Sequence, residues 1–375
     1  MKIKKILATC ALGTLYVASC TKSESSLSIT KNISKDTKFS SCIVDISESD
    51  FKNYGFTLGD SLDVEFSNGF SLKDVPYFNG YYVKTGKPVV VSYPGYNTVS
   101  ITYNNQGIWD QAKLSESDTV TIKLNSKAKY ITTQEALSQS YSNKLEDYTD
   151  KYEFANFRSM KGGALRENLL YRGASPCDNS HNRASTVDSI LKEYNITYNI
   201  DLADSTTNME NYLADTSYDF PYTKALYQNN NISLLSLSSS YEGDAYKQAV
   251  VRGLTLALDK SNESSKIYIH CMEGKDRTGF VCLLIEALCG ATYNEMKADY
   301  MQTYYNYYKI NEENSKSKYD AIVELYFNTF LESLHKTSDL DMLKSASFVD
   351  DAKAYLISGG MSSEKIEELI TFLTK

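Results

Sequence analysis

The segment from residue 266 to residue 291 places a charged loop between two apolar elements. The run "KIYIH" predicts a buried strand, and "RTGFVCLLIEALCGA" is apolar enough to predict a buried helix. Between them, Cys271, Lys275, Asp276 and Arg277 fall within seven positions. Such a cluster is costly to bury. The chain must therefore fold so that a strand and a helix hold this loop at an open edge of the core.

The remainder of the second half alternates strands and helices. Residues 196–204 predict another buried strand, and helices are predicted over 186–195, 245–261, 292–310, 348–360 and 362–375. This alternation predicts an α/β domain over residues 135–375, with a mostly parallel central sheet flanked by helices on both faces.

The first half has a different pattern, with short apolar runs separated by turn residues. The runs cover residues 61–66, 81–86, 87–93, 97–104 and 118–124. They predict a small all-β domain over residues 41–131, either a barrel or a sandwich, and a length of 375 residues suits two domains.

The N-terminal residues predict export. Three lysines within the first five residues precede an apolar run over residues 6–18, which suits a secretory signal over residues 1–19. The run ends in Val-Ala-Ser-Cys20, which resembles the bacterial lipoprotein box, so Cys20 is the expected lipidation site. An ordinary signal peptide remains the alternative. With a polar tether over residues 20–40, the chain would be lipid-anchored in the cell envelope, facing the periplasm or the exterior.

Composition excludes some partners and cofactors. The net charge of −8 argues against nucleic acid as the main partner, although a local basic pocket remains compatible with it. The chain has only three histidines and no C-x-x-C pair, so no metal site and no cofactor are expected. Nothing in the sequence predicts the oligomeric state.

The loop itself has the chemistry of an oxyanion site. Backbone N–H groups in such a loop, together with a helix N-terminus, bind a tetrahedral anion and favour the thiolate form of Cys271. Arg277 can grip two oxygens of the anion. Gly274 and Gly279 give the backbone freedom to curl. We expect His270 to hydrogen-bond nearby backbone and Thr278 to donate its hydroxyl to the thiolate. A Walker loop is a poor alternative because no Ser or Thr follows Lys275.

The sequence "HCMEGKDRTG" resembles the HCxxGKDRTG loop of the bacterial tyrosine and dual-specificity phosphatases, some of which act on lipids. "NFRSMKGG" at 156–163, "LLYRGASP" at 169–176 and "YNIDLAD" at 198–204 are similar to further segments of that family, and the likeness spans about residues 153–373. Two positions depart from the family, with Ser159 in place of an aspartate and Ala203 in place of an arginine.

The resemblance implies a two-step reaction through a phosphocysteine at Cys271. Arg277 would stabilise the transition state and Asp276 would serve as acid and base, with Asp204 and Asp244 as rival acids. Arg158 and Arg172 would brace the loop or contact substrate. The phosphate-binding residues would be Met272, Glu273, Gly274, Lys275, Asp276 and Arg277.

The resemblance leaves the substrate open. Phosphotyrosine or a related phosphomonoester is the leading expectation. In similar loops a lysine at the position of Lys275 goes with more highly charged substrates, so a phosphoinositide or inositol phosphate is the second. A third reading, from a different class, is a phosphate-binding lipoprotein without catalysis.

Overall fold

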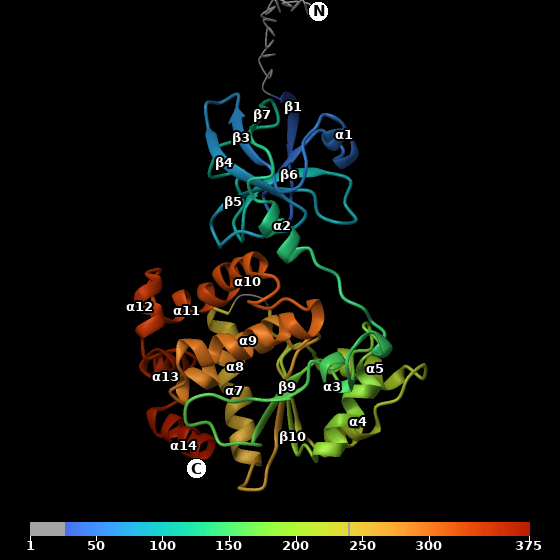
Figure 1. Cartoon of the computed structure of the whole chain (residues 1–375), viewed down its shortest axis with the longest axis vertical. Coiled ribbons are helices and arrows are strands. Elements are labelled where there is room, and N and C mark those ends of the chain that lie inside the picture. Colours follow the sequence, from blue (N-terminus) through green and yellow to red (C-terminus); the bar gives the residue numbers. More distant parts are fainter. Residues whose placement is uncertain (1–26, 239–240) are drawn as a thin grey trace, which may run out of the picture.

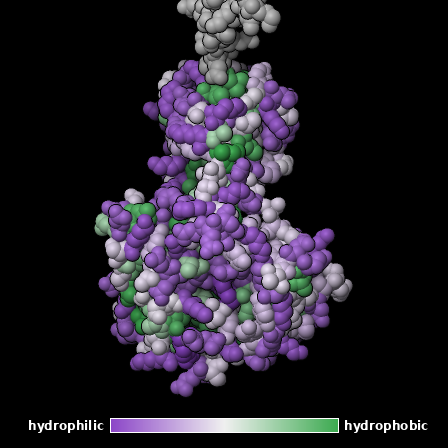
Figure 2. Space-filling model, viewed as in Figure 1, coloured by the Kyte–Doolittle hydropathy of each residue, from purple (hydrophilic) through white to green (hydrophobic). Residues whose placement is uncertain are grey.

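The computed structural model describes residues 27–238 and 241–375. The predicted signal peptide, the predicted lipidation site Cys20 and the first part of the predicted tether lie outside the described residues. The described chain forms an N-terminal β-domain and a larger α/β domain, which appear as two lobes joined by a narrower waist (Figures 1 and 2). No helix among the described residues is long and apolar enough to cross a membrane.

The N-terminal domain is a closed barrel, one of the two predicted alternatives. Its strand order is β1-β2-β6-β5-β4-β3-β7, and β1 pairs with β7 to close it. Neighbouring strands are antiparallel except β4 and β5. Alternate side chains fill the barrel interior, where Trp109 is also buried. The strands are β1 (Ser28–Lys35), β2 (Cys42–Val44), β3 (Ser61–Phe66), β4 (Ser71–Phe78), β5 (Pro88–Val91), β6 (Val99–Tyr103) and β7 (Thr119–Ser126), with one helix, α1 (Glu48–Asn53).

Three details of the barrel differ from the sequence predictions. The barrel begins at β1, so residues 28–35 belong to it and not to the tether predicted over 20–40. Residues 81–86 form an irregular connection and not a strand. The helix α2 (Ile131–Leu137) crosses the predicted domain boundary and packs on α10 (Lys316–Ile322) of the second domain.

The second domain contains a five-stranded sheet in the order β11-β10-β12-β9-β8. The three pairings among β11, β10, β12 and β9 are parallel, and β8 is an antiparallel edge strand. The predicted mostly parallel sheet is therefore confirmed in part. The strands are β8 (Arg158–Ser159), β9 (Leu170–Gly173), β10 (Tyr198–Asp201), β11 (Ile232–Leu234) and β12 (Ile267–His270).

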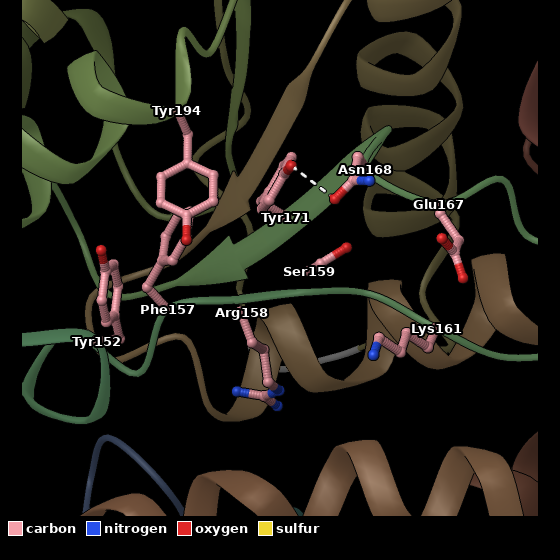
Figure 3. A pocket seen from close by; sticks show the side chains of 9 residues that line it. All are labelled: Tyr152, Phe157, Arg158, Ser159, Lys161, Glu167, Asn168, Tyr171 and Tyr194. Atoms are coloured by element: carbon pink, nitrogen blue, oxygen red, sulfur yellow. Dashed lines mark hydrogen bonds between the residues drawn. The ribbon is translucent and has the colours of Figure 1, made fainter.

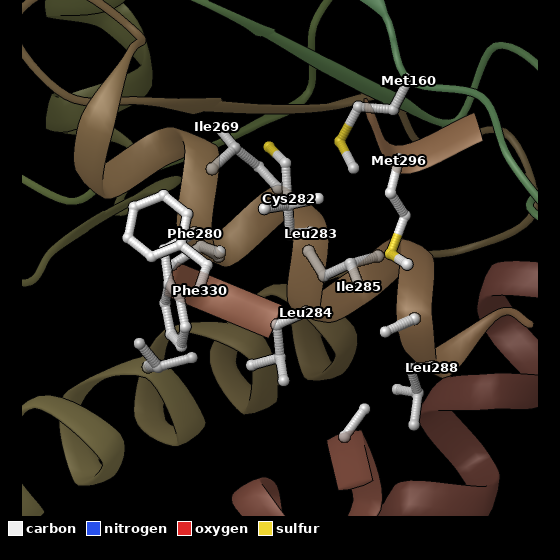
Figure 4. Close-up of a cluster of buried hydrophobic side chains, with 14 of the residues drawn as sticks. Met160, Ile269, Phe280, Cys282, Leu283, Leu284, Ile285, Leu288, Met296 and Phe330 are labelled. Atoms are coloured by element: carbon white, nitrogen blue, oxygen red, sulfur yellow. The ribbon is translucent and has the colours of Figure 1, made fainter. Parts of the chain in front are cut away.

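Helices cover both faces of this sheet because its strands are apolar on both sides. In β12, Ile267 and Ile269 join the core under α7 and α8, whereas Tyr268 joins a second core under α4. Helix α8 is buried from Thr278 to Leu288, and Figure 4 shows its side chains packed among those of neighbouring elements. The helices are α3 (Lys151–Phe154), α4 (Ala184–Tyr194), α5 (Thr206–Ala214), α6 (Pro221–Gln228), α7 (Asp244–Lys260), α8 (Asp276–Leu288), α9 (Tyr293–Tyr308), α10, α11 (Asn328–His335), α12 (Leu340–Ser345), α13 (Val349–Ser358) and α14 (Ser363–Thr374), with a π-helical turn at Val323–Phe327 and a 3-10 turn at Leu145–Asp147.

Candidate active site

The predicted loop lies at the carboxyl edge of the parallel sheet. His270, the last residue of β12, pairs with Asp201 at the end of β10 and with Gly173 at the end of β9. The chain then turns through residues 271–275 and enters α8 at Asp276. Ligands of parallel α/β sheets bind at this edge, outside the ends of the strands. The strand–loop–helix arrangement predicted from the sequence is confirmed.

Contacts outside the loop fix the direction of its peptide groups. The Ser175 N–H donates to the carbonyl oxygen of Met272 at 3.0 Å, and the Tyr307 hydroxyl donates to that of Glu273 at 2.7 Å. The Arg172 guanidinium donates to the carbonyl oxygen of Gly274 at 3.0 Å. Each N–H points opposite to the carbonyl of its own peptide plane. The N–H groups that follow these carbonyls therefore turn toward the inside of the loop, and no described residue accepts a hydrogen bond from them.

The loop also depends on a glycine at position 274. Gly274 has φ +69°, a conformation that side chains disfavour. A Cβ there would lie 2.2 Å from the carbonyl oxygen of Gly173. Gly279 is constrained in a different way, because a Cβ there would lie 2.8 Å from the ring of Tyr300. A larger residue at either position would therefore clash with its neighbours.

A buried ion-pair network supports the loop from behind. Asp299 of α9 pairs with Arg158 at 2.7 Å and also with Arg172, which is fully buried. Burial alone would raise the pKa of Asp299, but the two guanidiniums hold it at about 2. The Asn156 amide adds donors to the carbonyls of Glu273 and Gly274, and its oxygen accepts from Arg158. The two arginines therefore sit where a brace is expected.

Cys271 and Arg277 stand at the two ends of the loop, and both are at least half-buried. The Cys271 side chain is buried, with 3% of its surface exposed. Arg277 is half-buried and donates to the carbonyl oxygen of Leu237 at 3.3 Å.

The charge of Lys275 is largely offset by its neighbours. Its ammonium lies 3.0 Å from the Glu273 carboxylate and 4.0 Å from that of Asp276. Glu273 also accepts a hydrogen bond from Tyr141. Burial opposes ionisation of Glu273, but Lys275 and Tyr141 hold its pKa below the ordinary value. Nearby, His181 is half-buried and contacts the Tyr141 hydroxyl.

The three aspartates proposed as acids have different environments. Asp276 opens α8, and 63% of its side-chain surface is exposed. Asp244 is exposed in the first turn of α7. Asp204 is buried and accepts from the Tyr212 hydroxyl at 2.9 Å. Burial and the nearby Asp201 raise the pKa of Asp204 to about 7. A buried carboxyl has no route to a leaving group in solvent, which leaves the two exposed aspartates.

Of the residues expected to support the loop, His270 makes its predicted contact and Thr278 does not. His270 is fully buried, and its Nδ1 lies 3.2 Å from the Cys271 carbonyl oxygen, the predicted kind of backbone contact. The predicted bond from Thr278 to the thiolate is absent. Its hydroxyl oxygen is buried within the first turn of α8 and has no hydrogen-bond partner among the described residues. Met272 is 39% exposed on the loop surface.

A separate cavity lies at the β8 edge of the sheet. It has a volume of about 270 Å³ and is lined by four aromatic and five polar or charged side chains (Figure 3). Arg158 lines it, but its guanidinium turns away from the rings and toward Asp299. None of its lining residues belongs to the loop from Cys271 to Arg277. This cavity is therefore distinct from the candidate active site.

Several supporting residues were missed in the sequence. Asp299 and Tyr307 lie on α9, far along the chain from the residues that they contact, and no local pattern identifies them. Asn156 could have been identified from the sequence, because it begins the "NFR" segment. Tyr141 lies in the connection between the domains, where only a fold could reveal its contact with Glu273.

Comparison with known proteins agrees with this geometry. A model of the tyrosine phosphatase family matches residues 150–375, more than half of the chain. No curated protein matches the chain. Among solved structures, the crystal structure of an uncharacterized conserved protein from Thermotoga maritima is 18% identical over 26% of this chain and 36% of that chain, with a TM-score of 0.23. So low a TM-score adds nothing to the argument. With its family match and the loop at the carboxyl edge of the sheet, the chain belongs to the tyrosine phosphatase family.

Proposed function

We propose that this chain is an exported, lipid-anchored phosphatase that hydrolyses phosphotyrosine or related phosphomonoesters through a phosphocysteine intermediate. The observation that carries the proposal is the orientation of the loop. Three of its carbonyls accept hydrogen bonds from residues outside the loop, so the N–H groups that follow them point the opposite way, and no described residue accepts from them. Donors fixed in advance toward developing negative charge are the largest single source of catalysis in such sites.

In the first step the Cys271 sulfur attacks phosphorus as the bond from phosphorus to the leaving oxygen breaks. Asp276 gives its proton to that oxygen, and Arg277 with the loop N–H groups stabilises the equatorial oxygens. In the second step water attacks phosphorus, the sulfur–phosphorus bond breaks, and Asp276 takes up the proton. Inorganic phosphate and the thiolate of Cys271 are the products. Asp276 is preferred as the acid because it is exposed at the loop, whereas Asp204 is buried.

The charges around the loop favour a substrate with one phosphate. Arg158 and Arg172 are both paired with Asp299, and Lys275 is paired with Glu273. Arg277 has no ion-pair partner among the described residues. One unpaired guanidinium suits a single dianionic phosphate better than a phosphoinositide carrying several. This reasoning supports phosphotyrosine and leaves the phosphoinositide as the second candidate.

The proposed location rests on the sequence before the described residues. The lysine-rich start, the apolar run and Cys20 support a lipid anchor in the cell envelope. Metabolic labelling with a radioactive fatty acid tests this point. Label should enter the wild type and be absent from Cys20→Ala. Equal label in both would remove the anchor from the proposal.

The enzymatic proposal is tested with p-nitrophenyl phosphate. We expect hydrolysis that vanadate inhibits and that Cys271→Ser abolishes. Tight phosphate binding without hydrolysis would instead support a non-catalytic binding protein. A panel of phosphotyrosine peptides and phosphoinositides then separates the two enzymatic readings. A higher kcat/KM for a phosphoinositide would overturn the single-phosphate argument.

A further inference from the structure

The connection between the two domains reaches the candidate active site. Residues 138–150 join α2 to α3 (Figure 1). Arg183, which is 2% exposed, holds this connection by donating to the carbonyl oxygen of Ser142 at 2.9 Å. Its guanidinium also lies 4.9 Å from the centre of the Tyr141 ring. Tyr141 is thereby fixed beside the loop, although it precedes the residues 150–375 that the family model matches.

Two tyrosines hold Glu273, one at its side chain and one at its backbone. The Tyr141 hydroxyl donates to Glu273 Oε1, and the Tyr307 hydroxyl donates to the Glu273 carbonyl oxygen at 2.7 Å. The two rings are stacked, with centroids 4.7 Å apart and an interplanar angle of 22°. His181 Nε2 lies 3.9 Å from the same carboxylate oxygen as the Tyr141 hydroxyl. Stacked rings leave each hydroxyl little freedom, so the carboxylate of Glu273 is placed together with its backbone.

The second carboxylate oxygen of Glu273 pairs with Lys275. Glu273 Oε2 lies 3.0 Å from the Lys275 ammonium, and the two side chains are only 21% and 19% exposed. Asp276 is a weaker partner for this ammonium, because its oxygen lies 4.0 Å away and 63% of its side chain is exposed. Glu273 is therefore the main counter-charge of Lys275, and Tyr141 holds it in that position.

We propose that Tyr141 and Glu273 determine substrate specificity by keeping Lys275 paired, so that the loop accepts one phosphate and disfavours a second phosphate beside it. Lys275 can bind a second phosphate only after its pair with Glu273 is broken, and the freed carboxylate would then repel that phosphate. Building an unfavourable charge against the unwanted ligand is a common source of specificity. Tyr141 is a positioning residue, because it acts through Glu273 and not on the substrate. The inference rests on the proposed function and adds the cause of its substrate preference.

The loop pattern in the sequence does not set either residue. Glu273 occupies one of the two variable positions of HCxxGKDRTG, whereas Lys275 occupies a fixed one. The lysine alone led to the expectation of a phosphoinositide or inositol phosphate as the second candidate substrate. The preference depends on the partner of the lysine as well as on the lysine itself, and that partner is held from outside the loop.

The experiment compares substrates that differ by one phosphate. One pair is a peptide with a single phosphotyrosine and the same peptide with two adjacent phosphotyrosines. The other pair is a short-chain phosphatidylinositol monophosphate and a bisphosphate with neighbouring phosphates. The measured quantity is kcat/KM for the doubly phosphorylated member divided by that for the singly phosphorylated member. Glu273→Gln should raise this ratio about tenfold in at least one pair, because Lys275 is then free to make a charge-assisted hydrogen bond to the second phosphate. The pair that responds shows whether a peptide or a lipid headgroup supplies that phosphate.

Tyr141→Phe tests the positioning step. It removes only the hydroxyl and should raise the ratio about threefold, because Glu273 keeps its charge but loses one donor. Combined with Glu273→Gln it should add nothing, since a residue that acts through Glu273 has no effect without it. Adding Lys275→Gln to Glu273→Gln should abolish the gain. Tyr148→Phe is the matched control, because its hydroxyl donates to the Ser142 carbonyl oxygen at 2.6 Å in the same connection, and it should keep the wild-type ratio.

The inference is overturned if Glu273→Gln keeps the wild-type ratio in both pairs, or if the gain survives Lys275→Gln. It is also overturned if Tyr141→Phe gives the same ratio as Tyr148→Phe. The same ratios are measured as dissociation constants in the Cys271→Ser background, so that the outcome does not depend on hydrolysis. Binding ratios that change as expected in a chain without hydrolysis would overturn the enzymatic proposal and leave the specificity inference standing. Hydrolysis with unchanged ratios would overturn the inference and leave the proposed function standing.

Discussion

Replacing Gly274 with alanine should remove most activity while the chain still folds. Gly274 has φ +69°, and an L-residue in that conformation costs about 1–2 kcal/mol. The new Cβ would also lie 2.2 Å from the Gly173 carbonyl oxygen, where ordinary contact begins at 3.4 Å. Both groups are backbone, so no side chain can rotate to relieve the overlap. The loop must therefore shift by about 1 Å, which is enough to cost about 10²-fold in rate.

The assay compares kcat/KM for p-nitrophenyl phosphate with the free energy of unfolding in urea. Gly290→Ala is the matched control. Gly290 has φ +78°, but its nearest neighbour to a new Cβ is a Val349 methyl at 3.9 Å, and it lies beyond the end of α8. The control should lose about 1–2 kcal/mol of stability and keep its activity. If Gly274→Ala also keeps wild-type kcat/KM, the loop does not hold the geometry that we assign to it.

Three further predictions address the residues around the loop. Asp299→Asn should lower the free energy of unfolding in urea by about 3–5 kcal/mol, because two buried guanidiniums lose their counter-charge; a loss below about 1 kcal/mol would contradict this. Asp276→Asn should lower kcat for phenyl phosphate by about 10²-fold or more and that for p-nitrophenyl phosphate less, since the better leaving group needs less protonation; equal losses would exclude Asp276 as the acid. Burial raises the pKa of Glu286 in the folded chain well above its ordinary value. In the unfolded chain the pKa of this carboxyl is about 4.3. The contribution of Glu286 to the free energy of unfolding is therefore fully present below about pH 4.3 and is lost as the pH rises through the folded pKa. The free energy of unfolding of Glu286→Gln should therefore rise relative to that of the wild type between pH 5 and pH 8. A difference between the two proteins that does not change with pH would refute the raised pKa of Glu286.

The sequence predicted the loop because its determinants are local. A strand, a loop and a helix follow one another between residues 266 and 291, and each has its own hydrophobic pattern. The need for Gly274 and Gly279 is local too, because it follows from the tight turn of the loop backbone. The atoms that hold the loop are not local. Asp299 lies more than 120 residues from Arg172, and only the packing of α9 beside the sheet brings them together.

The barrel boundary was missed for a different reason. In β1 only Ile29 and Ile33 point inward, and the other six residues are polar. In sequence such a strand resembles a polar tether, because β1 is held in the barrel mainly by backbone hydrogen bonds to β7 and β2. The prediction of a strand over residues 81–86 was wrong for the opposite reason. Two tyrosines and a valine give this segment a high β-propensity, although it only connects β4 to β5.

The most direct test of the account is to trap the reaction intermediate. Protein mixed with a phosphotyrosine substrate is quenched within milliseconds, digested and mapped by mass spectrometry under conditions that preserve thiophosphate esters. We predict one phosphoryl group on the peptide that contains Cys271, formed and lost at rates consistent with turnover and absent from Cys271→Ser. Phosphoryl transfer to another residue, or turnover by Cys271→Ser at the wild-type rate, would contradict the central claim that this loop holds phosphate over a nucleophilic sulfur.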